Sequence, residues 1–369
     1  PGPCQAPGAG SNSHRVRGTL AGPALWGPFM ITRTLFAAAL CGAAFISSAP
    51  AQEYTFRLYQ FLPMTDSVPR EGLIPWAETI EDQSDGRIKI EYYPSMILGG
   101  APANLFDQAQ DGVVDLIWTV LGYTPGRFPK SEVFEMPFLV TNAEDTSRAF
   151  QRFVEENAMD EFAGVKLIAV HTHGPGVFHS SGPIETLEDL AGLKVRGGSR
   201  VISAMLTDLG AEAIGMPVPQ VPESLSRGVI DAATIPWQVT MALRTSEIVS
   251  HHTEFSGDHG LYTQTFAFVM NRDSYESLPD DLKAVIDANS GVEWAGRFGA
   301  ANDSDDIVAR DQALAEGNTI VTLDAEETAR WRAAAQITID NWFAETAENG
   351  IDGEALYGRA LELVAQETH

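Results

Sequence analysis

The sequence predicts an α/β protein built of two lobes. From Tyr54 onward, short runs rich in β-branched and aromatic residues alternate with longer amphipathic stretches, which is typical of α/β architecture. Residues 52–369 are numerous enough to form two lobes, each with its own core. No linker rich in proline and serine divides them, so we expect short crossings of the chain to join the lobes.

Individual elements follow from these patterns. Four runs have the composition of strands, at 54–61, 88–93, 165–171 and 266–271, and amphipathic helical segments occur at 73–83, 103–110 and 146–157. The segment after Leu278-Pro279-Asp280 starts with acidic residues and has no proline through residue 316, which predicts one or two long helices. A further helix is expected over 325–349, with Trp331 and Trp342 in the core.

The segment His173-Gly174-Pro175-Gly176 directly follows the predicted strand at 165–171. Glycine on both sides of a proline allows the backbone to turn sharply. We therefore predict that the chain leaves one sheet for the other at this point.

The region before the predicted fold has the features of a secretory leader. Arg33 follows Met30, an apolar run extends over 35–46, and small residues lead up to Ala51. The run is too short for a membrane-spanning helix, which needs roughly 20 residues. We therefore predict a signal peptide at 30–51 and a periplasmic location, and we interpret residues 1–29 as a spurious or disordered upstream segment.

Composition excludes several classes of function. The chain has 50 acidic and 24 basic residues, a formal net charge of −26, which disfavours binding to nucleic acid. Its two cysteines, Cys4 and Cys41, precede residue 52, so the predicted lobes contain no disulfide or thiol nucleophile. The sequence also lacks the G-x-S-x-G, H-E-x-x-H, P-loop and dinucleotide motifs, so we expect neither an enzyme nor a cofactor.

A candidate ligand anchor lies at the end of residues 187–196. This stretch, LEDLAGLKVR, predicts a short capped helix, a glycine terminator and a strand that ends at Arg196. Ligands of α/β proteins bind at the carboxyl ends of strands, and a guanidinium can hold a carboxylate by two parallel hydrogen bonds. Arg196 is therefore a candidate anchor for a small organic carboxylate. The alternative is a surface arginine that pairs with one of the many acidic side chains.

A series of short motifs extends along the chain: Ser84-Asp85-Gly86-Arg87, Gly112-Val113-Val114-Asp115, Phe134-Glu135-Met136-Pro137-Phe138, Pro183-Ile184, the stretch from Glu188 to Arg196, Gly228-Val229-Ile230-Asp231, Met270-Asn271 and Leu278-Pro279. In this order and spacing they resemble the DctP-type solute receptors of tripartite ATP-independent periplasmic (TRAP) transporters. The resemblance covers essentially all of residues 52–369.

The resemblance implies a two-lobed fold of the periplasmic-binding-protein type II kind, with a long helix that spans both lobes. We expect one lobe from 52–173 plus 262–301 and the other from 174–261 plus 302–369. It also implies that Arg196 binds the ligand carboxylate and that the lobes close on the ligand. A monomeric receptor would then deliver the ligand to a small DctQ-type and a large DctM-type membrane subunit.

Aromatic residues are the candidates for the rest of the pocket. By resemblance, the loop 115–123 contributes Trp118 and Tyr123, and the segment after Asp231 contributes Trp237 to the opposite wall. Phe61 and Phe178 are further candidates, although ordinary core packing is the alternative for each of these five side chains. Ala232 and Ile235 stand where many relatives have glycine and asparagine, which favours a partly apolar ligand over a sugar acid.

Other functions remain open at this stage. A receptor for an ABC importer would have the same bilobed fold, and a sensor partner would have the same pocket. A secreted metal-dependent enzyme could use His171 and His173, which alternate onto one face of a strand, or His251-His252. The segment Gly197-Gly198-Ser199 could hold an anion by its backbone N–H groups, although a phosphate loop would need more glycine and a following lysine.

Overall fold

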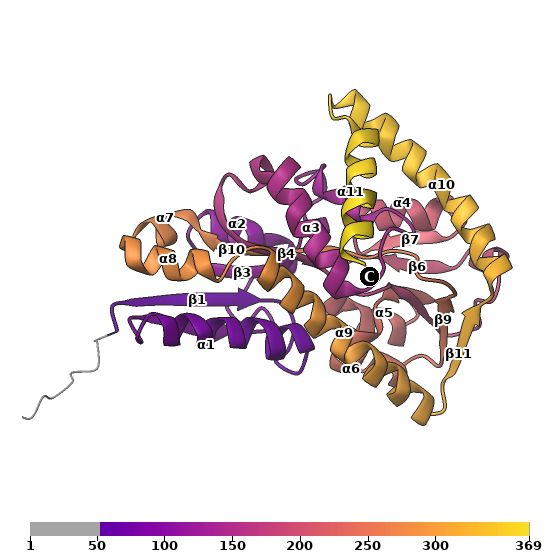
Figure 1. Ribbon diagram of the computed structural model, residues 1–369. Helices are drawn as coiled ribbons and strands as arrows, with labels where there is room; N and C mark the ends of the chain where they lie inside the picture. Colours follow the sequence, from indigo (N-terminus) through magenta and orange to yellow (C-terminus); the bar gives the residue numbers. More distant parts are fainter. Residues whose placement is uncertain (1–51, 369) are drawn as a thin grey trace, which may run out of the picture. The chain divides into compact units, whose positions relative to one another are not determined.

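The computed structural model describes residues 52–368, whose strands form two sheets (Figure 1). The first sheet has the order β2-β1-β3-β10-β4, with β1 at Tyr54–Gln60, β2 at Ile88–Tyr93, β3 at Leu116–Val120, β4 at Val165–Thr172 and β10 at Thr265–Asn271. The second has the order β11-β9-β5-β8-β6-β7, with β5 at Val177–Ser180, β6 at Lys194–Gly197, β7 at Glu212–Gly215, β8 at Ala232–Ile235, β9 at His251–Phe255 and β11 at Thr319–Leu323. The predictions for 1–29 and 30–51 lie outside the described residues.

Each sheet mixes parallel and antiparallel pairs. In the first, β1 is parallel to β2 and β3, while β10 lies antiparallel between β3 and β4. In the second, β6 is parallel to β7 and β8, while β5 lies antiparallel between β8 and β9. Because β4 and β5 belong to different sheets, the predicted crossing at 173–176 is confirmed. The chain returns to the first sheet at 256–264, before β10.

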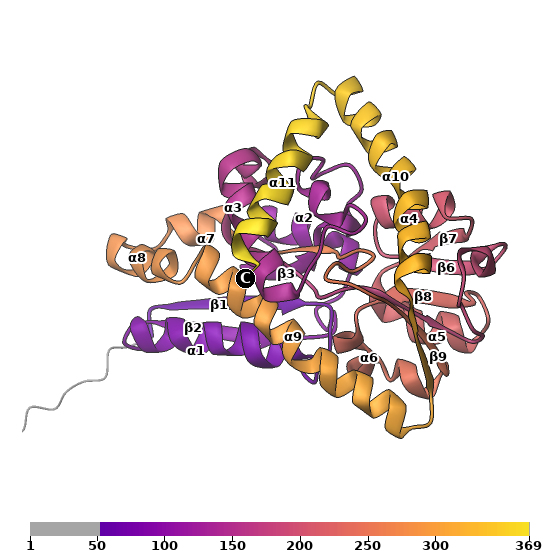
Figure 2. The ribbon, with the colours of Figure 1, turned by 45° about the vertical axis from the view of Figure 1, so that its right-hand side comes forward.

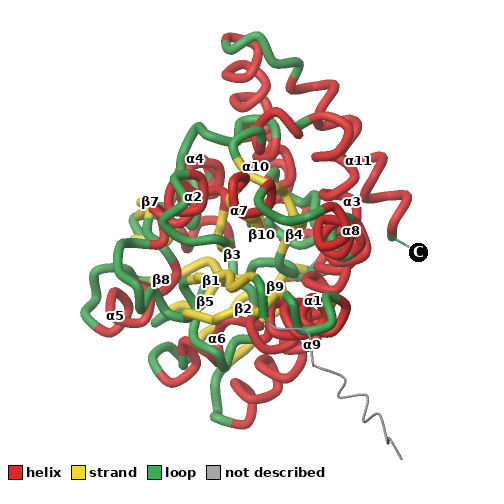
Figure 3. The backbone as a smooth tube through the Cα atoms, turned by 90° about the vertical axis from the view of Figure 1, so that its left-hand side faces the viewer, coloured by secondary structure: helices red, strands yellow, loops and turns green. Residues whose placement is uncertain are grey.

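Helices lie outside the strands (Figure 3). They are α1 at Ile74–Gln83, α2 at Leu105–Gln110, α3 at Ala143–Asn157, α4 at Arg200–Asp208, α5 at Val221–Ser226, α6 at Trp237–Leu243, α7 at Arg272–Glu276, α8 at Asp280–Ala288, α9 at Val292–Ala315, α10 at Ala325–Glu348 and α11 at Gly353–Glu367. The four predicted strands and the helix at 325–349 are confirmed, and Trp331 and Trp342 are buried. Among residues 52–368, no helix combines the length and apolar character that crossing a membrane requires.

The long helix α9 joins the two lobes. It packs against α3 and β4 on the side of the first sheet and against α6 on the side of the second (Figure 2). The predicted helical segment 280–316 is two helices, because the chain turns at Gly291, whose φ of 85° favours glycine. The two sheets and the shared helix form the two-lobed α/β fold that was expected.

The two last helices connect the lobes a second time. Helix α10 packs against α4 on the second sheet, whereas α11 returns to pack against α3. Leu363 and Val364 of α11 belong to the same core as Phe150 and Phe153 of α3. Residues 302–369 therefore contribute to both lobes, and the expected lobe boundaries stay a prediction.

Two helical glycines provide a matched test of the contact between α9 and α3. A Cβ atom at Gly299 would collide with the Ala143 carbonyl oxygen and lie 2.6 Å from the Glu144 Cα, whereas a Cβ at Gly358 of α11 would meet no atom within 4 Å. We expect Gly358→Ala to stabilise the protein by roughly 0.5–1 kcal/mol through helix propensity. Gly299→Ala should instead destabilise it by roughly 1–3 kcal/mol, because backbone atoms cannot yield easily. Urea unfolding measures both, and a stabilising Gly299→Ala would contradict this packing.

Candidate functional site

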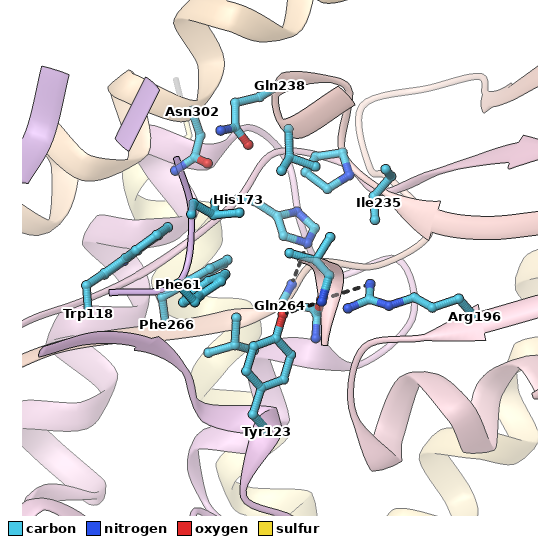
Figure 4. Close-up of a pocket in the computed structure, with 15 residues that line it drawn as sticks. Phe61, Trp118, Tyr123, His173, Arg196, Ile235, Gln238, Gln264, Phe266 and Asn302 are labelled. Carbon is cyan, nitrogen blue, oxygen red and sulfur yellow. Dashed lines mark hydrogen bonds between the residues drawn. The ribbon is translucent and has the colours of Figure 1, made fainter. Parts of the chain in front are cut away.

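A cavity lies between the two sheets, where several strands end. The first lobe contributes residues from the ends of β1 and β3 and from β10, and the second contributes residues from β6, β8 and α6. The free space they bound, including its mouth toward solvent, is ≈ 360 Å³. Its lining is Phe61, Leu62, Trp118, Val120, Tyr123, His173, Arg196, Val218, Ile235, Pro236, Gln238, Val239, Gln264, Phe266 and Asn302 (Figure 4).

Arg196 is held at one end of this cavity by backbone carbonyls. Strand β6 lies between β7 and β8, and the side chain extends from near its carboxyl end. The Nε donates to the Met216 carbonyl at 3.0 Å, and Nη1 donates to the Thr234 carbonyl at 3.0 Å. Arg196 is fully buried, and no acidic side chain within residues 52–368 forms an ion pair with it. The alternative of a surface arginine paired with an acidic neighbour is therefore wrong.

Hydrogen-bond donors without partners surround the guanidinium. In the described part of the chain, Arg196 Nη2 and Gln264 Nε2 are buried and have no acceptor. The Gln264 Oε1 lies 3.5 Å from Arg196 Nη1, which places the Gln264 amide next to the guanidinium. The Tyr123 hydroxyl oxygen accepts from the Val218 N–H at 2.9 Å, which leaves its hydrogen free to donate. This end of the cavity can therefore bind an acceptor with several lone pairs, such as a carboxylate.

Nearly parallel aromatic rings form one wall. The Trp118 ring lies 4.9 Å from that of Phe61 at an interplanar angle of 11°, and 5.3 Å from that of Phe266 at 7°. Tyr123 meets Phe61 edge to face at 5.6 Å. The rings stack on one another, and a rigid aromatic wall of this kind favours a planar ligand body over a bulky one.

His171, near the end of β4, and His173, in the crossing, are neutral, and the lone pair of each ring accepts a hydrogen bond. His173 Nδ1–H donates to the Gly174 carbonyl at 2.5 Å, and its Nε2 accepts from the Gln264 N–H at 3.1 Å. Burial, reinforced by the nearby Arg196 charge, lowers the pKa of His173 to about 3. Burial likewise lowers the pKa of His171 to about 3, and its Nε2 accepts from Trp118 Nε1–H at 2.7 Å. Neither imidazole has a lone pair free for a metal, and residues 52–368 contain no cluster of three potential metal ligands.

The other end of the cavity is polar. Gln238 of α6 donates from Nε2 to the Asp66 carboxylate at 2.6 Å, a hydrogen bond that crosses between the lobes. Asn302 of α9 donates from Nδ2 to the Phe298 carbonyl at 2.9 Å. Burial raises the pKa of Asp66 to about 7, although the Val68 N–H and Gln238 oppose this shift.

Two predicted pocket residues lie elsewhere. Phe178 of β5 is buried in the core of the second lobe, where its ring meets that of Trp331 at 5.5 Å. Trp237, the first residue of α6, donates from Nε1 to Glu254 at 2.8 Å and lines a different cavity, near Pro175 and His259. Of the six residues predicted for the site, Arg196, Phe61, Trp118 and Tyr123 share one cavity, and Phe178 and Trp237 do not line it.

Sequence reasoning missed four lining residues that carry hydrogen-bonding or aromatic groups. Gln264 and Phe266 lie in the return crossing and the start of β10, Gln238 follows Trp237 in α6, and Asn302 lies in the middle of α9. Gln238 could have been identified, because it follows the predicted wall residue Trp237 directly. The sequence around Gln264 and Asn302 gives no comparable signal.

Comparisons with known proteins agree with this geometry. A family model, DctP, described as bacterial extracellular solute-binding protein, family 7, matches residues 64–346. A TRAP solute-binding protein from Rhodoferax ferrireducens, solved with copurified benzoate, is 42% identical, with a TM-score of 0.83 over 85% of this chain and 98% of that one. A protein from an unidentified marine microbe, described as specific for aromatic acids and solved with 3-hydroxybenzoate, is 41% identical, with a TM-score of 0.85 over 86% of this chain and 100% of its own.

A curated relative is more distant. The outer membrane transporter protein TsaT of Comamonas testosteroni is 25% identical over 323 residues, which are 85% of this chain and 94% of that protein. The similarity therefore extends over nearly the whole length of each of these proteins.

The protonation state of His173 can be measured directly. Its lowered pKa and its two hydrogen bonds predict a neutral ring that carries its proton on Nδ1 from roughly pH 5 to 8, the range in which histidine ordinarily titrates. Nitrogen chemical shifts of the ring, recorded across this range, should stay constant. Unfolded protein in urea is the control and should titrate near about 6.5. A folded-state transition of His173 near that value would contradict the assignment.

Proposed function

Since the chain belongs to the DctP family of TRAP-type extracellular solute-binding proteins, we propose that it captures a small aromatic carboxylate through Arg196 and delivers it to a membrane permease. The observation that carries this proposal is the buried Arg196 charge, which has no acidic partner in residues 52–368 and an Nη2 without an acceptor.

The cost of the isolated charge supports an anionic ligand. Burying an ion without a counter-charge costs several kcal/mol even after local relaxation. Carbonyl groups of Met216 and Thr234 offset a part of this cost, but Nη2 remains unsatisfied. A carboxylate at Nη2 would supply both the missing acceptor and the opposite charge, and charge-assisted hydrogen bonds of this kind are strong.

Neighbouring donors favour a carboxylate over a neutral acceptor. Gln264 Nε2 and the Tyr123 hydroxyl lie beside Arg196 in Figure 4, and both have a hydrogen to donate. A carboxylate has two oxygens with about four lone-pair sites, enough for these donors together. His173 cannot compete as an acceptor, because its Nε2 is already bound to the Gln264 N–H.

The aromatic wall and the two similar structures together support an aromatic body. Phe61, Trp118 and Phe266 present nearly parallel rings, against which a planar ring can stack. The two structures described above contain benzoate and 3-hydroxybenzoate and are each more than 40% identical to this chain. An aromatic monocarboxylate fits both the rings and the single cationic group.

Release to a permease follows from the family and from the cavity's position between the lobes. Contacts from both lobes enclose the ligand, so its exit requires the lobes to separate at their crossings. The receptor acts in the periplasm after removal of the leader at 30–51. It leaves its ligand chemically unchanged and transfers it to the small DctQ-type and large DctM-type membrane subunits.

Replacement of Arg196 tests the anchor. Arg196→Met keeps an unbranched but shorter side chain and removes the charge, so benzoate affinity should fall by roughly 100-fold or more. Arg196→Lys should recover little, because a single ammonium cannot reproduce the guanidinium fork. Calorimetric titration with benzoate measures both effects.

Stability separates loss of the site from loss of the fold. The unliganded Arg196→Met protein should unfold at the wild-type temperature or above it, since an unpaired buried charge is removed. Arg227→Met is the matched control, because the Arg227 side chain is 72% exposed and should affect neither property. Wild-type affinity for benzoate in Arg196→Met would refute the proposed anchor.

A ligand screen by thermal unfolding tests the substrate class. A ligand present at 100 times its dissociation constant adds about 2.7 kcal/mol of stability. We expect benzoate and hydroxybenzoates to raise the melting temperature, and glucuronate, which lacks a planar ring, to raise it much less. A larger shift with glucuronate than with every benzoate would count against an aromatic ligand.

A further inference from the structure

The amide of Gln238 has a defined orientation. Its Nε2 lies 2.6 Å from Asp66 Oδ2, and an ionised carboxylate, the form of Asp66 above its pKa of about 7, can only accept a hydrogen bond. The other Asp66 oxygen accepts from the Val68 N–H at 3.1 Å. The amide nitrogen therefore faces Asp66, and the Gln238 Oε1 points away from it.

The amide of Asn302 is oriented in the same way by its own helix. Its Nδ2 donates to the Phe298 carbonyl at 2.9 Å and lies 3.5 Å from the Thr172 carbonyl. Both partners are backbone oxygens and accept only, so the exchanged orientation of the amide would place oxygen against oxygen. The Asn302 Oδ1 is therefore the atom left to face other groups.

Both amide oxygens are available to a ligand. Neither accepts a hydrogen bond from any donor in residues 52–368, although the side chains are only 4% and 2% exposed. Both residues line the cavity, and Figure 4 shows them side by side, across the cavity from the Arg196 guanidinium. Neither oxygen is among the fully buried atoms without a partner, so both are open to the cavity and can accept a hydrogen bond from a donor placed there.

We infer that the ligand carries an uncharged hydrogen-bond donor, such as a phenolic hydroxyl, at the end opposite its carboxylate, and that Gln238 and Asn302 bind it. The inference rests on the proposed function, because the carboxylate at Arg196 defines the other end of the ligand. An ammonium group fits less well, because a charged group loses more hydration than a hydroxyl does when it is placed beside Phe61 and Leu62.

Pairs of ligands that differ in one ring substituent, a hydroxyl or a fluorine, test the inference on the wild-type protein. Fluorine resembles a hydroxyl in size but has no hydrogen to donate. At about pH 8.5, Asp66 is ionised and holds the Gln238 amide in place. We expect 3-hydroxybenzoate or 4-hydroxybenzoate to bind at least about tenfold more tightly than its fluorinated counterpart in calorimetric titrations.

Variants then test which residue binds the donor. Asn302→Leu removes the amide oxygen at similar side-chain volume, so the advantage of hydroxyl over fluorine should fall to about threefold or less. The readout is the ratio of the two affinities, so a loss of affinity that the hydroxy and fluoro acids share equally does not affect the test. Asn341→Leu, on the exposed face of α10, is the matched control and should keep the full advantage.

The outcomes distinguish this inference from the proposed function. Equal binding of the hydroxy and fluoro acids by the wild-type protein would overturn the inference and leave the aromatic-acid receptor intact. An unchanged hydroxyl advantage in folded Asn302→Leu would overturn the assignment to this residue. Failure of all benzoates to bind the wild-type protein would overturn the proposed function, and the inference with it. Because the ligand pairs are measured on the wild-type protein, the inference is tested even if Asn302→Leu does not fold.

Discussion

The site depends on one buried positive charge that the described chain leaves without a counter-charge. The chain has 50 acidic residues, yet Arg196 contacts the Met216 and Thr234 carbonyls and the Gln264 Oε1. Strand β6 supplies its position, and the carbonyls of Met216 and Thr234 hold the guanidinium in place. Because the side chain is ordered when the protein folds, little conformational entropy would be lost on binding of the proposed anion, whose donors are already in position.

The titratable side chains next to Arg196 carry no negative charge that would neutralise the guanidinium. His173 is neutral because burial and Arg196 itself disfavour its protonated form, and burial raises the pKa of the Tyr123 hydroxyl, which stays protonated. The protein as a whole carries a net charge of −26, which repels anions at long range. Salt screens such repulsion beyond roughly 10 Å, whereas the buried guanidinium acts at contact distance in a poorly hydrated cavity. For the proposed anionic ligand, the contact with Arg196 therefore outweighs the repulsion by the net negative charge of the protein.

The fold was largely predictable because its signals are local. Strand composition, helix start signals and the Gly-Pro-Gly crossing each depend on a few neighbouring residues, and β1, β4, α10 and the break between sheets appear where they were expected. Arg196 was identifiable because it ends a strand within a recognisable motif. The return of α11 to the first lobe was not, because no local pattern shows which of two cores an amphipathic helix will cover.

The pocket was less predictable, since side-chain direction decides membership and depends on tertiary packing. Along β5, successive side chains face opposite ways, so Phe178 packs against Trp331 while His179 meets Trp237. Trp237 and Gln238 are adjacent in α6, yet the indole binds Glu254 outside the cavity and the amide lines it. The sequence predicts the wall segment, and the turn of the helix decides which of its residues faces the cavity.

The resulting cavity has opposite hydrogen-bonding character at its two ends. Donors gather around Arg196, and amide oxygens face the space beside Gln238 and Asn302. A ligand with an acceptor at one end and a donor at the other can satisfy both ends in one orientation, and reversal would place like groups together. Gln238 also donates a hydrogen bond to Asp66 across the lobes, so the amide proposed to bind the ligand is also part of the contact between the lobes.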